Sequence, residues 1–230
     1  MLLKIIKEEV KMKTKNEAIK IVEILKQTYP DAKCSLDFTT PFEMMVAVML
    51  SAQCTDARVN LTTPALFKEY NTPEKMAKID IKLLEKIIHP CGFYKNKSKN
   101  IIAASKMLVE KYNGQVPDNI DELIKIPGVG RKSANVIMLE AFHKPCGIAV
   151  DTHAKRISNK LGLSNESDPL KIEQDLINLY PQKYFYDINH LLVEHGRNCC
   201  NARKPDCENC SVKNFCDYFK KSLDNSKQKF

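Results

Sequence analysis

Apolar residues recur at helical spacing along most of the chain. Residues 17–29 predict a first helix whose apolar residues are Ile19, Ile21, Val22, Ile24 and Leu25. The run "PFEMMVAVML" is apolar nearly all round, which predicts a buried central helix, and Thr40 and Pro41 are suited to begin it. Further helical patterns occupy the segments "TDARVNLTTPALFKEY", "SKNIIAASKMLVEKYNG", "PDNIDELIKI", "RKSANVIMLEAF", "DTHAKRISNKLGL", "DPLKIEQDLINLY" and "FYDINHLLVEHG". Period-two alternation is rare, so we predict an all-α fold.

The amino-acid composition limits the class of protein but does not identify a function. The 230 residues are 43% hydrophobic, enough for one large domain or two small ones. A net charge of +8 suits a nucleic-acid partner, and it also suits a Lys-rich protein without one. No run approaches the ~20 apolar residues of a membrane span. The first 15 residues, interrupted by Glu8 and Glu9, do not form a signal peptide. We therefore expect an intracellular protein, cytoplasmic and nucleoid-associated if prokaryotic, that lacks disulfides.

The nine cysteines are concentrated near the C-terminus. Cys200, Cys207, Cys210 and Cys216 follow the spacing C-x6-C-x2-C-x5-C, which indicates a bound metal or cluster. Structural zinc usually takes two close pairs, and here there is one. The looser spacing favours a [4Fe–4S] cube, with zinc as the alternative. We treat Cys199 as a non-ligand. The scattered Cys34, Cys54, Cys91 and Cys146 are expected in the core, and the Lys-rich tail after the cluster is expected to be mobile.

The loop between the first two of these cysteines contains Arg203 and Lys204. Held at both ends, it would present two cations to phosphate groups. An ordinary solvated basic loop is the alternative.

The segment "IPGVGRKSANV" resembles a phosphate-binding loop at first sight. Such a loop needs G-x4-G-K-[ST] after a strand. Here Arg131 precedes Lys132, the first glycine would fall at Ile126, and the preceding segment is helical. These three failures exclude a P-loop hydrolase.

A helix-hairpin-helix is the better interpretation of the same segment. Gly128, Val129, Gly130 and Arg131 form the turn and the start of the second helix. The two glycines would adopt φ > 0 and let a partner approach, and free helix-start amides would bind a DNA phosphate. A plain helix–helix turn is the alternative.

Two residues near this hairpin are candidates for chemistry. Lys132 lies in the first turn of a helix, where the dipole and Arg131 disfavour a protonated amine, and only the neutral amine is a nucleophile. Asp151 precedes the helix that begins at Thr152, which predicts an N-cap. A surface lysine and a purely structural cap remain the alternatives.

In combination, these motifs resemble the endonuclease III family of DNA glycosylases with lyase activity. The match runs from about Ile19 to Tyr218 and includes "PFEMMVAVMLSAQCTDARVN", "IPGVGRKSANV", "AVDTH", "HGRNC" and "ARKPDCENC" in the family's order. The resemblance implies two helical lobes with DNA between them. It places a six-helix barrel with the hairpin at 34–144 and a discontinuous iron–sulfur domain at 1–33 and 145–230.

The resemblance also implies the site residues and the reaction. Lys132 would be the nucleophile and Asp151 the carboxylate, acting on double-stranded DNA with oxidised pyrimidines or abasic sites. Gln53 would fill the gap left by a flipped base. Phe93 stands where many members have a leucine wedge. The implied cofactor is one [4Fe–4S] cluster, and we expect a monomer.

One departure and two rivals qualify this expectation. The segment "KPCGIAVDTH" has one residue more than is usual before the aspartate. A monofunctional mismatch glycosylase of the same superfamily is the nearest rival, but such enzymes generally lack the lysine. A non-catalytic DNA-binding iron–sulfur protein is the second rival, and Lys132 with Asp151 disfavours it.

Overall fold

The computed structural model describes residues 12–227, with side chains up to residue 223. Within these residues all regular structure is helical, as predicted. The prediction about the first 15 residues falls mostly outside the described part. No helix of the described residues is long and apolar enough to cross a bilayer.

The chain divides into two compact units. One is the continuous stretch Cys34–Ala149, and the other joins Met1–Lys33 to Val150–Phe230. The expected boundary, between 144 and 145, falls in the non-helical segment 143–151 that follows α8.

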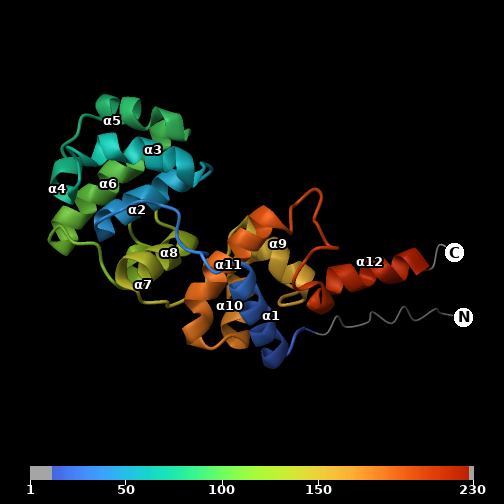
Figure 1. Cartoon of the computed structure of the whole chain (residues 1–230). Helices are drawn as coiled ribbons and strands as arrows, with labels where there is room; N and C mark the ends of the chain where they lie inside the picture. The colour runs from blue at the N-terminus through green and yellow to red at the C-terminus, as the bar shows by residue number, and fades with distance from the viewer. Residues whose placement is uncertain (1–11, 228–230) are drawn as a thin grey trace, which may run out of the picture. The chain divides into compact units, whose positions relative to one another are not determined.

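The continuous unit is built around one buried helix, α2 (Pro41–Ser51), which packs against α3, α6 and α8 (Figure 1). All residues from Phe42 to Leu50 are buried, so the predicted central helix is confirmed. The other elements of this unit are α3 (Asp56–Phe67), α4 (Pro73–Met76), α5 (Ile81–Ile88), η1 (His89–Cys91), α6 (Tyr94–Tyr112), α7 (Ile120–Leu123) and α8 (Arg131–Phe142).

The start of α2 follows from its sequence. Thr40 is the N-cap and its hydroxyl accepts from the Glu43 amide at 3.1 Å, with Pro41 in the first turn. The buried Glu43 carboxylate accepts from the Thr39 amide at 2.7 Å and from its hydroxyl at 2.6 Å. One oxygen of this buried carboxylate thus accepts two hydrogen bonds at the positive end of the helix dipole.

The discontinuous unit contains α1 (Lys15–Thr28), α9 (Thr152–Leu161), α10 (Pro169–Leu179), η2 (Gln182–Tyr184), α11 (Phe185–Asn198), η3 (Lys213–Phe215) and α12 (Asp217–Lys227). Helix α11 packs against α1 and α9. It approaches α9 closely at Gly196, where a Cβ would lie 2.6 Å from Cδ2 of His153. Lys26 on α1 pairs with Asp187 on α11 at 2.9 Å.

The ends of this unit contain helix that the sequence patterns did not predict. The first helix begins at Lys15, because Thr14 and Glu17 form a capping box. The tail after the cysteines forms helix α12 through Lys227. Its first turn is held by an ion pair between Lys13 and Asp217, and the Lys160 amine lies 4.0 Å from the Tyr218 ring centroid.

The four scattered cysteines differ in burial, although all were expected in the core. Cys91 is buried, and Cys34 and Cys54 are half-buried against the hydrophobic core. Cys146 is exposed, which corrects its assignment to the core. It lies in the loop after α8, where no neighbouring helix covers it.

Candidate active site and cysteine group

The hairpin lies between α7 and α8, as the glycine pattern predicted. Gly128 has φ +82°, and the Val129 amide donates to the Ile126 carbonyl at 3.0 Å to close the turn. Gly130 is the N-cap of α8 and has φ −91°. The prediction of φ > 0 is therefore right for Gly128 and wrong for Gly130.

The two glycines are needed for different reasons. A Cβ at Gly128 would lie 2.8 Å from Cε of Met49 and 2.9 Å from Cβ of Asn100, so this glycine permits close packing inside the unit. A Cβ at Gly130 would meet nothing within 4 Å. The side chain of Val129 is buried, so a contact from that position has to use the main chain. Open space beside Gly130 leaves the start of α8 accessible to an anion.

Lys132 is the second residue of α8 and its side chain is exposed. Arg131 beside it is also exposed. Because Gly130 has no side chain to cap the helix, the first-turn amides lack the usual side-chain acceptor. An exposed amine next to an uncapped helix start is an arrangement suited to a negatively charged substrate.

Gln53 and Phe93 lie at the rim of one pocket in the continuous unit. This pocket of about 170 Å³ is lined by Met49, Ala52, Gln53, Phe93, Asn96, Lys97, Asn100 and Gly128. Phe93 is 63% exposed, so it is not part of the hydrophobic core. Both residues adopt the left-handed conformation, with φ 53° at Gln53 and 46° at Phe93. Such a conformation costs a non-glycine residue about 1–3 kcal/mol and is common at functional sites.

Asp151 is the N-cap of α9, as predicted. One carboxylate oxygen accepts from the Ala154 amide at 2.7 Å, and the other lies 3.2 Å from Nδ1 of His153. Its side chain is partly exposed. Asp151 belongs to the discontinuous unit and Lys132 to the continuous one.

The cysteine group lies at the end of α11. Cys200, Cys207, Cys210 and Cys216 all line one pocket, together with Cys199 and His195. Burial raises the pKa of the thiols of Cys200, Cys210 and Cys216, and the nearby Cys207 thiol raises it further. Four thiols around one pocket form a donor set that a cationic metal centre would stabilise in the thiolate form.

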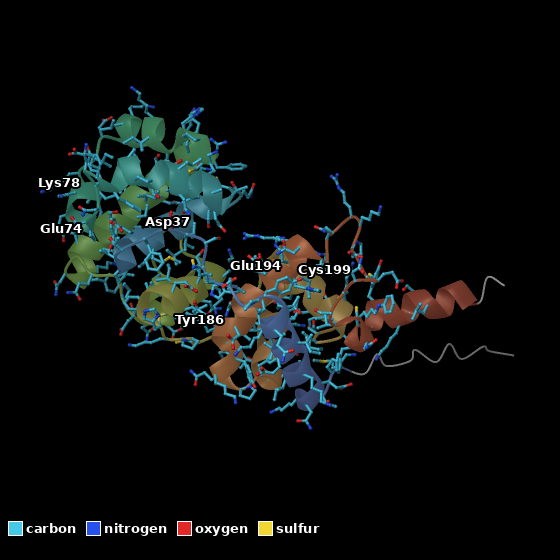
Figure 2. All side chains as sticks on the ribbon, in the orientation of Figure 1. Asp37, Glu74, Lys78, Tyr186, Glu194 and Cys199 are labelled. Carbon is cyan, nitrogen blue, oxygen red and sulfur yellow. The ribbon has the colours of Figure 1, made fainter. Side chains whose placement is uncertain are left out.

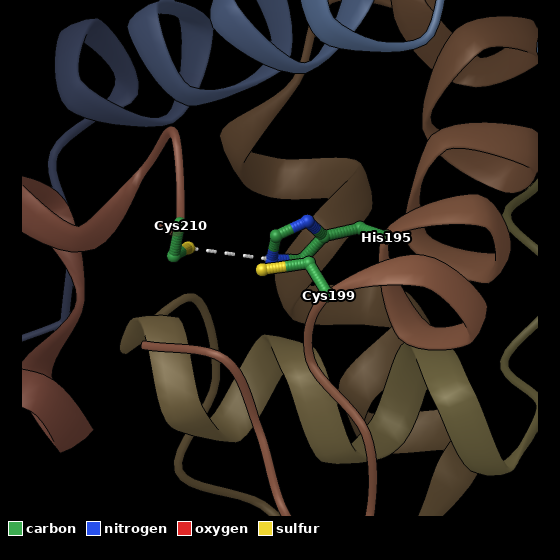
Figure 3. A group of neighbouring side chains, drawn as sticks. All are labelled: His195, Cys199 and Cys210. Carbon is green, nitrogen blue, oxygen red and sulfur yellow. Dashed lines mark hydrogen bonds between the residues drawn. The ribbon is translucent and has the colours of Figure 1, made fainter. Parts of the chain in front are cut away.

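His195 and Cys199 join this group more closely than the sequence suggested. Figure 3 shows the His195 ring directed at Cys210, with Nε2 3.7 Å from the Cys210 Sγ, and Cys199 beside it. Ligand atoms of His195, Cys199 and Cys210 all lie within 4.8 Å of one another. The spacing of His195 and Cys199, four residues apart at the end of a helix, was the signal for this. His195 is buried, and Cys199 lies just beyond α11 (Figure 2).

The second ring nitrogen of His195 lies 3.1 Å from the Tyr29 hydroxyl. Burial, helped by Arg156, lowers the pKa of His195 to about 4, and burial raises the pKa of Tyr29 to about 12. At neutral pH both groups are therefore uncharged, as expected for polar side chains inside the unit.

Arg203 and Lys204 are exposed on the loop 201–206. The base of this loop is held by main-chain contacts. The Asp206 amide donates to the Cys199 carbonyl at 3.0 Å, and the Arg156 guanidinium donates to the Cys200 carbonyl at 2.9 Å. Sequence reasoning missed Arg156, because its partner is a main-chain oxygen 44 residues away.

Comparison with known proteins agrees with these features. Residues 46–182 match the family described as HhH-GPD superfamily base excision DNA repair protein. Curated relatives named endonuclease III include proteins of Synechocystis, 46% identical over 88% of this chain and 92% of the relative, and of Bacillus subtilis, 44% identical over 82% and 86%.

Solved structures agree with the sequence relatives. A non-covalent endonuclease III–DNA complex matches with a TM-score of 0.87 and 41% identity, covering 92% of this chain and 99% of that one. A trapped endonuclease III–DNA covalent intermediate matches with the same TM-score and identity. A thermostable thymine-DNA glycosylase, at 22% identity and a TM-score of 0.80, shares the fold. The chain belongs to the endonuclease III family of the HhH-GPD base excision DNA repair superfamily.

Proposed function

We propose that this chain is a bifunctional base excision repair enzyme. It removes oxidised pyrimidines from double-stranded DNA as a glycosylase and cleaves the strand 3′ to the resulting abasic site as a lyase. The observation that supports this most directly is the exposed Lys132 in the first turn of α8, next to an open hairpin glycine. A family member trapped as a covalent intermediate with DNA adds support.

In this proposal Lys132 is the nucleophile. With the damaged nucleotide flipped out of the stack, its neutral amine attacks the sugar C1′, and the bond from C1′ to the base breaks. Ring opening gives a Schiff base, and removal of a C2′ proton expels the 3′ phosphate by β-elimination. Asp151 stabilises the cationic sugar and assists proton transfers.

The DNA contacts come from both units. The main chain from Gly128 to Arg131 binds one backbone phosphate. Gln53 fills the space left by the flipped base and Phe93 inserts as an apolar wedge, which their exposed left-handed positions support. Arg203 and Lys204 contact phosphates from the loop beside the cysteine group.

The cysteine group holds one [4Fe–4S] cluster through Cys200, Cys207, Cys210 and Cys216. The cluster is structural here, because it fixes the loop that contains Arg203 and Lys204.

Residues 34–144 are the barrel with the hairpin, and 1–33 with 145–230 are the cluster domain. The protein acts as a monomer and, in a prokaryote, at the nucleoid, where its substrate is.

Borohydride trapping tests the lyase. The protein is incubated with a duplex containing thymine glycol or an abasic site, and borohydride reduces any Schiff base to a stable adduct. We expect an adduct from the wild type and from Lys111→Gln, which removes an exposed lysine of α6. Lys132→Gln should give none. An adduct that persists in Lys132→Gln would assign the nucleophile elsewhere.

The same experiment separates the two rivals. Base release without an adduct would indicate a monofunctional mismatch glycosylase, and binding without either would indicate a non-catalytic protein. Asp151→Asn should lower turnover by about a hundredfold while sparing binding, since the amide still accepts from Ala154 but lacks the charge. Iron and sulfide analysis distinguishes a cube from zinc.

A further inference from the structure

Lys97 on α6 is a buried lysine that the proposed mechanism does not use. It is 7% exposed, and its amine donates to the carbonyls of Leu50 at 2.8 Å and Cys91 at 2.9 Å. Burial lowers its pKa, and the thiols of Cys54 and Cys91 are the nearest titratable groups. No carboxylate pairs with this amine within the described residues.

The two carbonyls are placed at the ends of two separate elements. Leu50 lies in the last turn of α2, and Cys91 is the last residue of η1. Carbonyls at a helix end lack intrahelical donors, and they lie at the negative end of the dipole. The Lys97 ammonium therefore links the C-terminal ends of α2 and η1. Without it, the carbonyls at these helix ends would be unsatisfied acceptors inside the unit.

Each of these two helix ends is followed closely by one of the two residues with a left-handed backbone conformation. Gln53 follows Leu50 by three positions, and Phe93 follows Cys91 by two. Strained conformations of this kind persist only where the surrounding structure holds them. Lys97 lines the same pocket as Gln53 and Phe93, so the amine lies beneath the two turns.

We propose that Lys97 is a positioning residue that fixes the turns of Gln53 and Phe93 relative to each other, so that both side chains enter the DNA together. This inference rests on the proposed DNA contacts of those two residues. The other buried positions of α6 are all uncharged: Ser98, Ile101, Ala104, Ser105 and Leu108. A lysine among them costs desolvation that a neutral residue would avoid, which is consistent with selection for geometry.

A duplex with 2-aminopurine opposite a tetrahydrofuran abasic analogue gives the readout, because its fluorescence rises when the base is unstacked. Measurements at saturating protein separate this signal from affinity. Wild type and Lys106→Met, which removes an exposed lysine of the same helix, should give the full rise. Lys97→Met should give less than about a third of it and lower kcat/KM about tenfold. Thermal melting checks that each variant is folded at the assay temperature.

A second comparison separates positioning from general destabilisation. In the double variant Gln53→Ala/Phe93→Ala, adding Lys97→Met should lower kcat/KM by less than about twofold, since residues acting through one another are non-additive. Another tenfold loss there would overturn the proposal, as would a full fluorescence rise in Lys97→Met. If Lys97→Met does not fold, Lys97→Gln, which retains one amide donor group, replaces it under the same criteria.

Failure of the underlying function looks different from failure of this inference. If wild type forms no borohydride adduct, the proposed reaction is wrong. If wild type forms the adduct but Gln53→Ala/Phe93→Ala matches it in fluorescence and turnover, the DNA contacts are wrong and the positioning proposal fails with them. If only Lys97→Met matches wild type, the positioning proposal alone is wrong.

Discussion

The hairpin pocket and the cysteine group are built in opposite ways. Around Gln53, Phe93 and Gly128, function depends on main-chain conformations held by a packed core and by the amine of Lys97. Around Cys210, it depends on side chains that gather at a helix end, where burial raises the pKa of the Cys210 thiol. The first region is held by packing and by main-chain hydrogen bonds, whereas a positive centre would favour the thiolates of the second.

The largest expected effect is the loss of the metal centre. We expect Cys207→Ser, or chelation of the proposed metal centre, to lower hydrogen-exchange protection of the loop 201–216 by more than about a thousandfold, because most of this loop is exposed. Protection in α2 should remain. The matched control is Cys146→Ser, at an exposed cysteine outside the group. Equal losses in both units would contradict the distinction between the two regions.

Gly128→Ala should destabilise the packed region. The added methyl group would lie within 3 Å of Met49 and Asn100, at φ +82°, so the free energy of unfolding should fall by about 2–4 kcal/mol. Urea denaturation measures it. A loss below about 1 kcal/mol would mean that the turn can relax and is not fixed by packing.

Cysteine alkylation tests the burial of individual thiols. Burial raises the pKa of Cys34 to about 11 from 9.0, so at pH 8 its thiolate fraction is about a hundredfold lower than that of an ordinary thiol. We expect iodoacetamide to modify the exposed Cys146 first and Cys34 at least about a hundredfold more slowly, as followed by mass spectrometry. Comparable rates would show that the core around Cys34 is open.

Gly130→Ala should have the smallest effect on folding and a selective effect on binding. Its φ of −91° suits alanine and its Cβ would meet nothing, so unfolding should change by less than about 1 kcal/mol. A methyl group beside the helix-start amides should weaken DNA binding about tenfold. Fluorescence anisotropy at fixed salt measures this. Unchanged affinity would remove this position from the phosphate contact.

The sequence correctly predicted those structural elements that are determined by neighbouring residues in the chain. The apolar run of α2, with Thr40 and Pro41 before it, specified a buried and capped helix, and the Asp before α9 specified its cap. Lys132 was placed correctly in a first turn because glycines mark the hairpin.

Features that depend on distant partners were missed or wrong. The φ of Gly130 is the extended conformation usual for a helix N-cap, which the expectation of φ > 0 overlooked. The exposure of Cys146 depends on tertiary packing that no local pattern encodes. The contact of His195 with Cys210 joins the end of a helix to a loop, and Lys97 acts on a carbonyl 47 residues away. Helix α12 was not predicted, because its contacts with Lys13 and Lys160 are tertiary.

The two hydrogen bonds of the Arg156 guanidinium have a consequence for protein molecules that lack the proposed cluster. Arg156 lies one turn after the Asp151 cap on α9, and its guanidinium holds the Cys200 and Gly196 carbonyls. In the proposed function, a copy without the cluster would lack the group that fixes that loop, and Arg156 would lose its contact with Cys200 beside the helix that presents Asp151. We expect such a copy to be inactive on DNA. A cell starved of metal would therefore accumulate inactive enzyme rather than enzyme that leaves incompletely processed strand breaks.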